Sequence, residues 1–157
     1  MDHQVGMPQK HAIPKSALVL GWLGVLPFAL FSLVAVATRS QVAGHAATAL
    51  VLYGMIILSF MGGAQWGLAM RAPDEATPAL ARRLGISVLP ALGAFALGAL
   101  PPRPALLGLA LLFAALLAYD LTTVRAGAAP AWYGKLRMQL TAAVVLCLLT
   151  ACVFGAA

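Results

Sequence analysis

Five long apolar stretches, separated by short polar connections, constrain this chain more than any other feature of its sequence. Each stretch has close to the ~20 residues that an α-helix needs to cross the ~30 Å hydrocarbon core of a bilayer. None alternates between apolar and polar residues as a strand of a membrane barrel does. The sequence therefore predicts an all-α, polytopic membrane protein: a bundle of five transmembrane helices surrounded by the lipid bilayer.

The predicted organisation is a short tail followed by one membrane domain. We expect residues 1–15 to be a flexible, polar, cytoplasmic tail and residues 16–157 to form the five-helix domain. The approximate spans are 16–38, 46–70, 80–100, 105–123 and 136–157. Pro90 lies near the middle of the third span, where we expect a kink, and Pro101–Pro104 predicts a tight turn between the third and fourth spans.

The first span has a competing interpretation as a cleaved signal peptide. Ala35-Val36-Ala37 resembles a cleavage site. However, the apolar region of a signal peptide has about 7 to 15 residues, and the span at 16–38 is longer. We therefore expect an uncleaved first helix.

Composition excludes several classes of protein. The chain is 62% hydrophobic and 9% charged, whereas soluble domains have about 25% charged residues. Its net charge of +6 comes from Lys and Arg scattered through short loops, without the basic patch of a nucleic-acid-binding protein. Cys147 and Cys152 lie five residues apart in an apolar helix, so they do not share a face and lack the spacing of a metal or redox motif.

The basic residues predict the orientation of the helices. With five spans and a cytoplasmic N-terminus, eight Lys and Arg fall on the inner side and two on the outer side. The inner residues are Lys10, Lys15, Arg71, Arg82, Arg83, Arg125, Lys135 and Arg137, and the outer ones are Arg39 and Arg103. This bias follows the positive-inside rule. Together with an alanine-rich composition, it favours a multi-pass protein of a bacterial inner membrane.

Two polar residues within the apolar spans are candidates for a site. Asp120 is the one acidic residue in these spans, and a carboxylate there needs a partner. Arg137 is the first candidate partner, because a short loop makes the fourth and fifth helices neighbours, and Arg83 is the second. Gln65 is also costly in lipid unless it is hydrogen-bonded, so we expect it either to bond another helix or to contact a ligand.

These residues suggest a ligand-binding site near the cytoplasmic end of the bundle. Its candidate residues are Gln65, Trp66, Asp120, Trp132, Tyr133 and Arg137. A separate pattern, Ser59, Gly63 and Gly67, places small residues on one helix face, where helices can approach closely. That face is either a packing seam inside the chain or a contact with another chain.

Two motifs resemble a known family. Residues 58–67 read LSFMGGAQWG and residues 132–141 read WYGKLRMQLT, and Tyr53-Gly54 and Pro90 accompany them. Together they resemble the transmembrane protein 69-like family, also called domain of unknown function 3429. The resemblance implies a small multi-pass membrane protein of bacteria or mitochondria with no settled activity. Many members of that family have His where this chain has Gln65, so the resemblance puts a metal or proton role at that position in doubt.

The sequence favours a non-enzymatic function without deciding it. No nucleotide-binding, hydrolase or metal-ligand motif is present, and no histidine lies deep in a span. We predict no cofactor and no metal. The favoured hypothesis is a scaffold, assembly factor or accessory protein, acting with a membrane protein partner or as a homo-oligomer. The alternatives are a binding site or enzyme for a lipid, quinone or other hydrophobic ligand, and transport by an oligomer.

Overall fold

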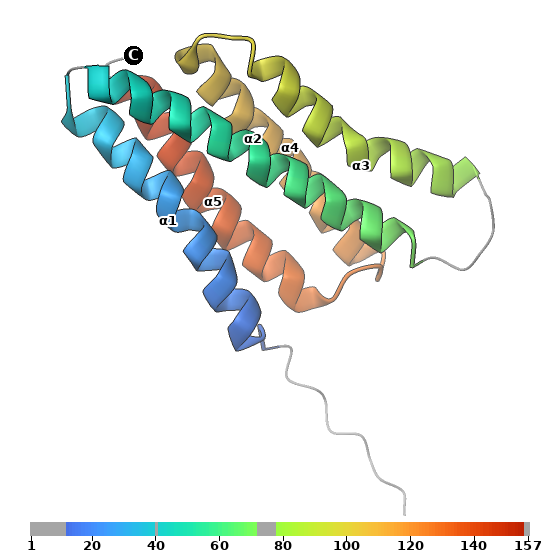
Figure 1. Ribbon diagram of the computed structural model, residues 1–157. Coiled ribbons are helices and arrows are strands. Elements are labelled where there is room, and N and C mark those ends of the chain that lie inside the picture. The colour runs from blue at the N-terminus through green and yellow to red at the C-terminus, as the bar shows by residue number, and fades with distance from the viewer. Residues whose placement is uncertain (1–11, 40, 72–77, 156–157) are drawn as a thin grey trace, which may run out of the picture.

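The computed structural model describes residues 12–39, 41–71 and 78–155, and within these ranges the chain forms five helices and no strand (Figure 1). They are α1 (Lys15–Ala37), α2 (Gln41–Ala69), α3 (Pro78–Leu97), α4 (Pro102–Arg125) and α5 (Ala131–Phe154). Each helix is long and apolar enough to cross a membrane. The predicted all-α fold with five spanning helices is therefore confirmed.

The helices form a closed ring in which each helix packs against its neighbours in sequence and α5 returns to α1. A further contact between α2 and α4 crosses the ring and gives it a centre. Consecutive helices run in opposite directions, as Figure 1 shows. As a result, α1, α3 and α5 begin at the same end of the bundle, and α2 and α4 finish there. We refer to it as the basic end, because Lys15, Arg82, Arg83, Arg125 and Lys135 lie near it.

The centre of the bundle is a small aromatic and aliphatic core. Phe28 of α1 is fully buried and makes edge-to-face contacts with Tyr53 of α2 and Phe113 of α4, at ring-centroid distances of 4.9 and 5.8 Å. Such pairs stabilise by about 0.5–1.5 kcal/mol beyond the area that they bury. The outer surface is just as apolar: Phe95, Phe60 and Leu20 are 78%, 70% and 69% exposed. Soluble monomers rarely expose so much apolar surface, and lipid is the solvent that it suits.

All five helices begin earlier than predicted, and three of them do so by at least three residues. α2 starts at Gln41 and takes in the polar residues before 46, and α5 starts at Ala131 and not at 136, so that Trp132 and Tyr133 lie on a helix. α4 starts at Pro102 because proline is tolerated in a first helical turn, where its missing N–H has no intrahelical partner to lose. The predicted turn at Pro101–Pro104 is therefore mostly the first turn of α4.

α3 lies against α2 and α4 and is the least buried of the five helices. It runs unbroken through Pro90, which is buried against α2. α2 and α3 approach closely at Gly62, where an added Cβ would stand 2.6 Å from the backbone oxygen of Ser87. Of the predicted flexible tail, residues 1–11 lie outside the described residues, and Lys15 already belongs to α1.

Candidate functional site

A buried polar cluster joins α2, α4 and α5 near the basic end. Its centre is Asp120, which has no exposed surface. One carboxylate oxygen accepts a hydrogen bond from the Nε2 amide of Gln65 on α2, and the other accepts one from Nε of Arg137 on α5 at 2.5 Å. The predicted ion pair between Asp120 and Arg137 and the predicted interhelical bond of Gln65 are both confirmed.

The position of the cluster follows from the local sequence. Asp120 lies five residues before the end of α4, and Arg137 lies six residues after the start of α5. At a rise of 1.5 Å per residue both side chains start about 8–9 Å inside the helix ends. The short connection makes α4 and α5 antiparallel neighbours, so these depths match. An ion pair at such a depth is stable only if both charges stay paired.

The cluster contains polar atoms that the chain itself does not satisfy. Within residues 12–39, 41–71 and 78–155, three buried side-chain atoms have no hydrogen-bond partner: the Tyr133 hydroxyl, Nη2 of Arg137 and Oγ1 of Thr141. The Tyr133 hydroxyl lies beside Asp120 and Gln65. Arg137 and Thr141 are 5% and 3% exposed, so bulk solvent does not reach them. A buried polar group without a partner costs about 1–3 kcal/mol.

Arg137 and Thr141 line an apolar groove that runs between α1, α2 and α5. The groove has a volume of about 160 Å³, and Leu20, Gly24 and Phe60 are among its other lining residues. Leu20 and Phe60 are also strongly exposed on the outside of the bundle. The groove therefore leads from the lipid-facing surface to the two unpartnered polar side chains.

A second cavity, of about 220 Å³, lies on the other side of the cluster between α2, α3 and α4. Gln65, Arg82 and Arg83 line it together with Tyr119, Thr122 and Thr123. Arg83, the second candidate partner of Asp120, is exposed here, while Arg137 makes the ion pair. The hydroxyls of Thr122 and Thr123 already donate to carbonyls of their own helix turn, so the charged groups that this cavity presents are the exposed side chains of Arg82 and Arg83.

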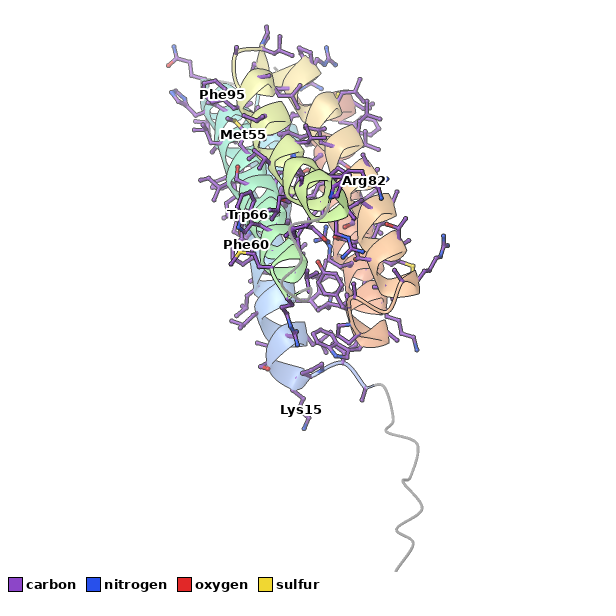
Figure 2. The ribbon with its side chains drawn as sticks, turned by 90° about the vertical axis from the view of Figure 1, so that its right-hand side faces the viewer. Lys15, Met55, Phe60, Trp66, Arg82 and Phe95 are labelled. Atoms are coloured by element: carbon purple, nitrogen blue, oxygen red, sulfur yellow. The ribbon has the colours of Figure 1, made fainter. Side chains whose placement is uncertain are left out.

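The structure does not bring all the predicted site residues together. Gln65, Asp120, Tyr133 and Arg137 meet in the cluster, but Trp66 is 42% exposed and points away from it. Figure 2 shows Trp66 beside Phe60 on the side of α2 that faces away from α4 and α5. Trp132 is half-buried and contacts the edge of Tyr133, at a ring-centroid distance of 6.3 Å, without lining either cavity.

The small-residue face of α2 is also turned outward. Ser59, Gly63 and Gly67 are all exposed, and a Cβ added to either glycine would meet no atom of the described chain within 4 Å. Among the described residues, no helix packs against the two glycines of this triplet. Gly62, one residue away and about 100° round the helix, makes the close approach to α3. A contact with another chain stays a prediction.

Comparison with known proteins assigns the chain to a family. A family model described as "Protein of unknown function (DUF3429)" matches residues 13–153, which is most of the chain. The chain belongs to the DUF3429 family. It is also similar to "Transmembrane protein 69" of Xenopus tropicalis, with 42% identity over 65 residues. That match covers 41% of this chain and 25% of the relative, so the chain spans only a part of that protein's length. No solved structure matches.

Family membership agrees with the earlier resemblance and with a multi-pass membrane protein. Sequence reasoning missed two residues of the DUF3429 chain that the structure singles out. Thr141 could have been found, because it follows Arg137 by four residues and so shares its helix face in an otherwise apolar segment. Gly62 could not, since nothing in the sequence separates it from Gly63.

Proposed function

We propose that this protein is a non-catalytic, accessory membrane protein whose bundle binds a lipid-soluble molecule in the groove between α1, α2 and α5. The observation that carries the proposal is that Arg137 and Thr141 line an apolar groove, and that each has one buried polar atom, Nη2 and Oγ1 respectively, without a partner among the described residues. Apolar walls with a few convergent polar groups are the usual composition of a small-molecule site.

The residues around the groove favour ligand binding over the alternative that the polar cluster only stabilises the fold. A structural ion pair is most stable when every polar atom around it is satisfied. Here Asp120 is satisfied by Gln65 and Arg137, but Arg137 keeps one free nitrogen. Gly24 adds no side chain to the groove wall, and a Cβ at that position would meet no described atom within 4 Å. The groove is therefore open beside Gly24.

The test is to fill the groove and ask whether a bound molecule is lost. The protein is extracted gently from its own membrane and studied by native mass spectrometry, before and after the substitution Gly24→Leu. We expect a retained lipid-soluble molecule in the unmodified protein and its loss in the variant. The control is Gly85→Leu, which also adds a side chain at an exposed helical glycine with no described atom within 4 Å, but on α3 and outside the groove. Retention of the molecule in both variants would overturn the proposal.

A second candidate function is that of a scaffold or assembly factor. It is favoured by the outward position of Ser59, Gly63 and Gly67, which leaves a shallow small-residue face on a membrane helix. Such faces let helices of two chains approach closely. Replacing both Gly63 and Gly67 by Leu should then abolish a homo-oligomer or a copurifying membrane protein, whereas Gly85→Leu should not. An unchanged assembly in the double variant would refute this function and, with it, transport by an oligomer.

We further infer that the basic end faces the cytoplasm of a bacterial inner membrane. The last turn of α4 carries Arg125 and the first half of α3 carries Arg82 and Arg83, whereas Arg39 and Arg103 lie at the opposite end. Cysteine labelling tests the orientation in a background without Cys147 and Cys152. A membrane-impermeant thiol reagent added to intact cells should modify Thr38→Cys and leave Ala126→Cys unmodified. The reverse pattern would invert the topology.

A further inference from the structure

The chemistry of the groove narrows the class of molecule that it can hold. This step rests on the proposed function above. Arginine has only donors, so Nη2 of Arg137 requires an acceptor. Thr141 lies one helical turn further along α5, on the same face. Both atoms are without a partner among the residues that the structure describes. A ligand that satisfies Nη2 of Arg137 must therefore present at least one hydrogen-bond acceptor.

Thr141 differs from four of the five other described threonines in a way that points to a ligand, and the fifth, Thr150, is less buried. Thr38, Thr48, Thr122 and Thr123 each donate to a backbone carbonyl three or four residues earlier. That local bond is the usual way for a helical threonine to satisfy its hydroxyl. The Thr141 hydroxyl, although 3% exposed, makes no such bond to any described residue. It remains free to donate to a molecule in the groove.

The charge of the cluster selects a neutral acceptor. Arg137 is already neutralised by Asp120, so the pair carries no net charge. A carboxylate or phosphate entering the groove would add an uncompensated negative charge about 9–15 Å inside the end of α5. Unpaired charges at such depths are strongly unfavourable. A carbonyl oxygen accepts from both donors and brings no charge.

The size of the groove limits the part of the ligand that enters. Its volume of about 160 Å³ is close to the ~150 Å³ of an apolar cavity that holds one benzene molecule. One ring-sized or ester-sized group fills it. Leu20 and Phe60, which line the groove and are also exposed, would leave the remainder of the molecule in the surrounding lipid.

We propose that the groove binds the carbonyl group of a neutral lipid-soluble molecule, with Nη2 of Arg137 and Oγ1 of Thr141 as its donors and Asp120 as the residue that holds Arg137 in position. Two sources share this chemistry: the ring carbonyl of a quinone and the ester carbonyl of a neutral glyceride. Ionised fatty acids are excluded by their charge and alkanes by their lack of an acceptor.

Four probes of similar chain length test the proposal on the full-length protein in lipid nanodiscs: a decyl-benzoquinone, a didecanoyl glycerol, decanoate and decane. We expect one of the two carbonyl probes to bind at least about tenfold tighter than decanoate or decane. The substitution Thr141→Val removes one hydrogen bond and should weaken that probe by about 3- to 10-fold. Thr150→Val, on the same helix and outside the groove, should leave binding unchanged.

Asp120→Asn provides the sharper test, because it leaves Arg137 with an unmatched positive charge. Decanoate should then gain affinity by tenfold or more relative to the carbonyl probes. If this variant does not fold, the carbonyl inference is tested by the relative affinities of the four probes for the unmodified protein and by the change in affinity in Thr141→Val. Tightest binding of decanoate to the unmodified protein, or an unchanged affinity in Thr141→Val, would overturn the carbonyl inference while leaving the groove a ligand site. Failure of every probe, with no effect of Gly24→Leu on retained molecules, would overturn the proposed function as well.

Discussion

The two faces of α2 contain similar residues, but one face is buried in the bundle and the other is exposed. Gly54, Leu58, Gly62 and Gln65 lie on the inner face and are buried. On the outer face Phe60, Gly63, Trp66 and Gly67 are exposed. Both faces combine glycines with larger side chains, and both are largely apolar. The difference between them is that the inner face has specific partners: α3 beside Gly62, Leu109 beside Gly54 and Asp120 beside Gln65.

The two faces show what decides which side of a membrane helix packs against the other helices. Burial of apolar area does not distinguish the faces, since lipid tails are as apolar as leucine. Close backbone approach and polar bonds do distinguish them. In this bundle α2 and α5 both donate to the carboxylate of Asp120, and α2 also donates to α1 through the hydroxyl of Tyr53, which bonds the backbone oxygen of Gly24. Substitutions that affect the inner face of α2 should therefore cost far more than matched substitutions on the outer face.

The largest effect is expected from Asp120→Ala, because it removes the group to which the inner face of α2 and α5 are both bonded. Arg137 would remain buried with an unpaired charge, at a cost of about 3–5 kcal/mol. Equilibrium unfolding in mixed detergent micelles measures this loss, which should also appear as poor recovery of monodisperse protein.

The control for Asp120→Ala removes both charges together. In the double variant Asp120→Ala, Arg137→Leu no unpaired charge remains, so much of the lost stability should return. If the double variant is as unstable as the sum of the two single variants, the ion pair contributes no coupling energy and is not the polar centre of the bundle.

How much the sequence could predict follows from the same physics. Span length and the scarcity of charge predicted five helices, because both are direct requirements of the bilayer. The pair of Asp120 and Arg137 was predictable because Asp120 is the sole acidic residue in the spans and α4 and α5 are joined by a short connection. Each of these inferences depends only on the sequence of one helix or of two consecutive helices.

The failures concern rotation of a helix about its axis. Trp66 and Gln65 are adjacent in sequence, but about 100° apart on the helix, and only Gln65 faces α4. In the same way Gly62 contacts α3 and Gly63 does not. A soluble helix reveals its rotation by a polar stripe, whereas α2 is apolar on both faces. The packing face of such a helix is set by its neighbours and cannot be read from its own residues.

The second-largest effect is expected from Gly62→Ala, measured against Gly63→Ala. A Cβ on Gly62 would stand 2.6 Å from the backbone oxygen of Ser87, so α2 and α3 must separate. Overpacking of this kind costs about 1–3 kcal/mol. At Gly63 a Cβ meets no atom of the described residues, and the better helix propensity of alanine should stabilise by up to about 1 kcal/mol. Equal stabilities in equilibrium unfolding would show that the approach of α2 to α3 is not tight.

A smaller loss is expected from Gln65→Leu, which keeps the approximate volume of the side chain and removes its bond to Asp120. Hydrogen bonds between membrane helices contribute about 0.6 kcal/mol on average and at most about 1.7, and this one involves a charge. We expect a loss of about 1–2 kcal/mol in equilibrium unfolding. Combining Gln65→Leu with Asp120→Ala should add little further loss, because both remove the same bond. Full additivity would separate Gln65 from the cluster.

The smallest effect is expected from Trp66→Leu, the matched change at the neighbouring position on the outer face of α2. Trp66 is 42% exposed and no hydrogen bond of its side chain is seen among the described residues. A lipid-facing Leu should replace it within about 0.5 kcal/mol. The change in stability caused by Trp66→Leu is measured for the purified monomer in detergent and compared with the change in native membranes. A loss in the membrane as large as that of Gln65→Leu, without a loss in the monomer, would mean that another chain covers this face. The outer face of α2 would then be an interface with another chain, just as the inner face is an interface with other helices of this chain.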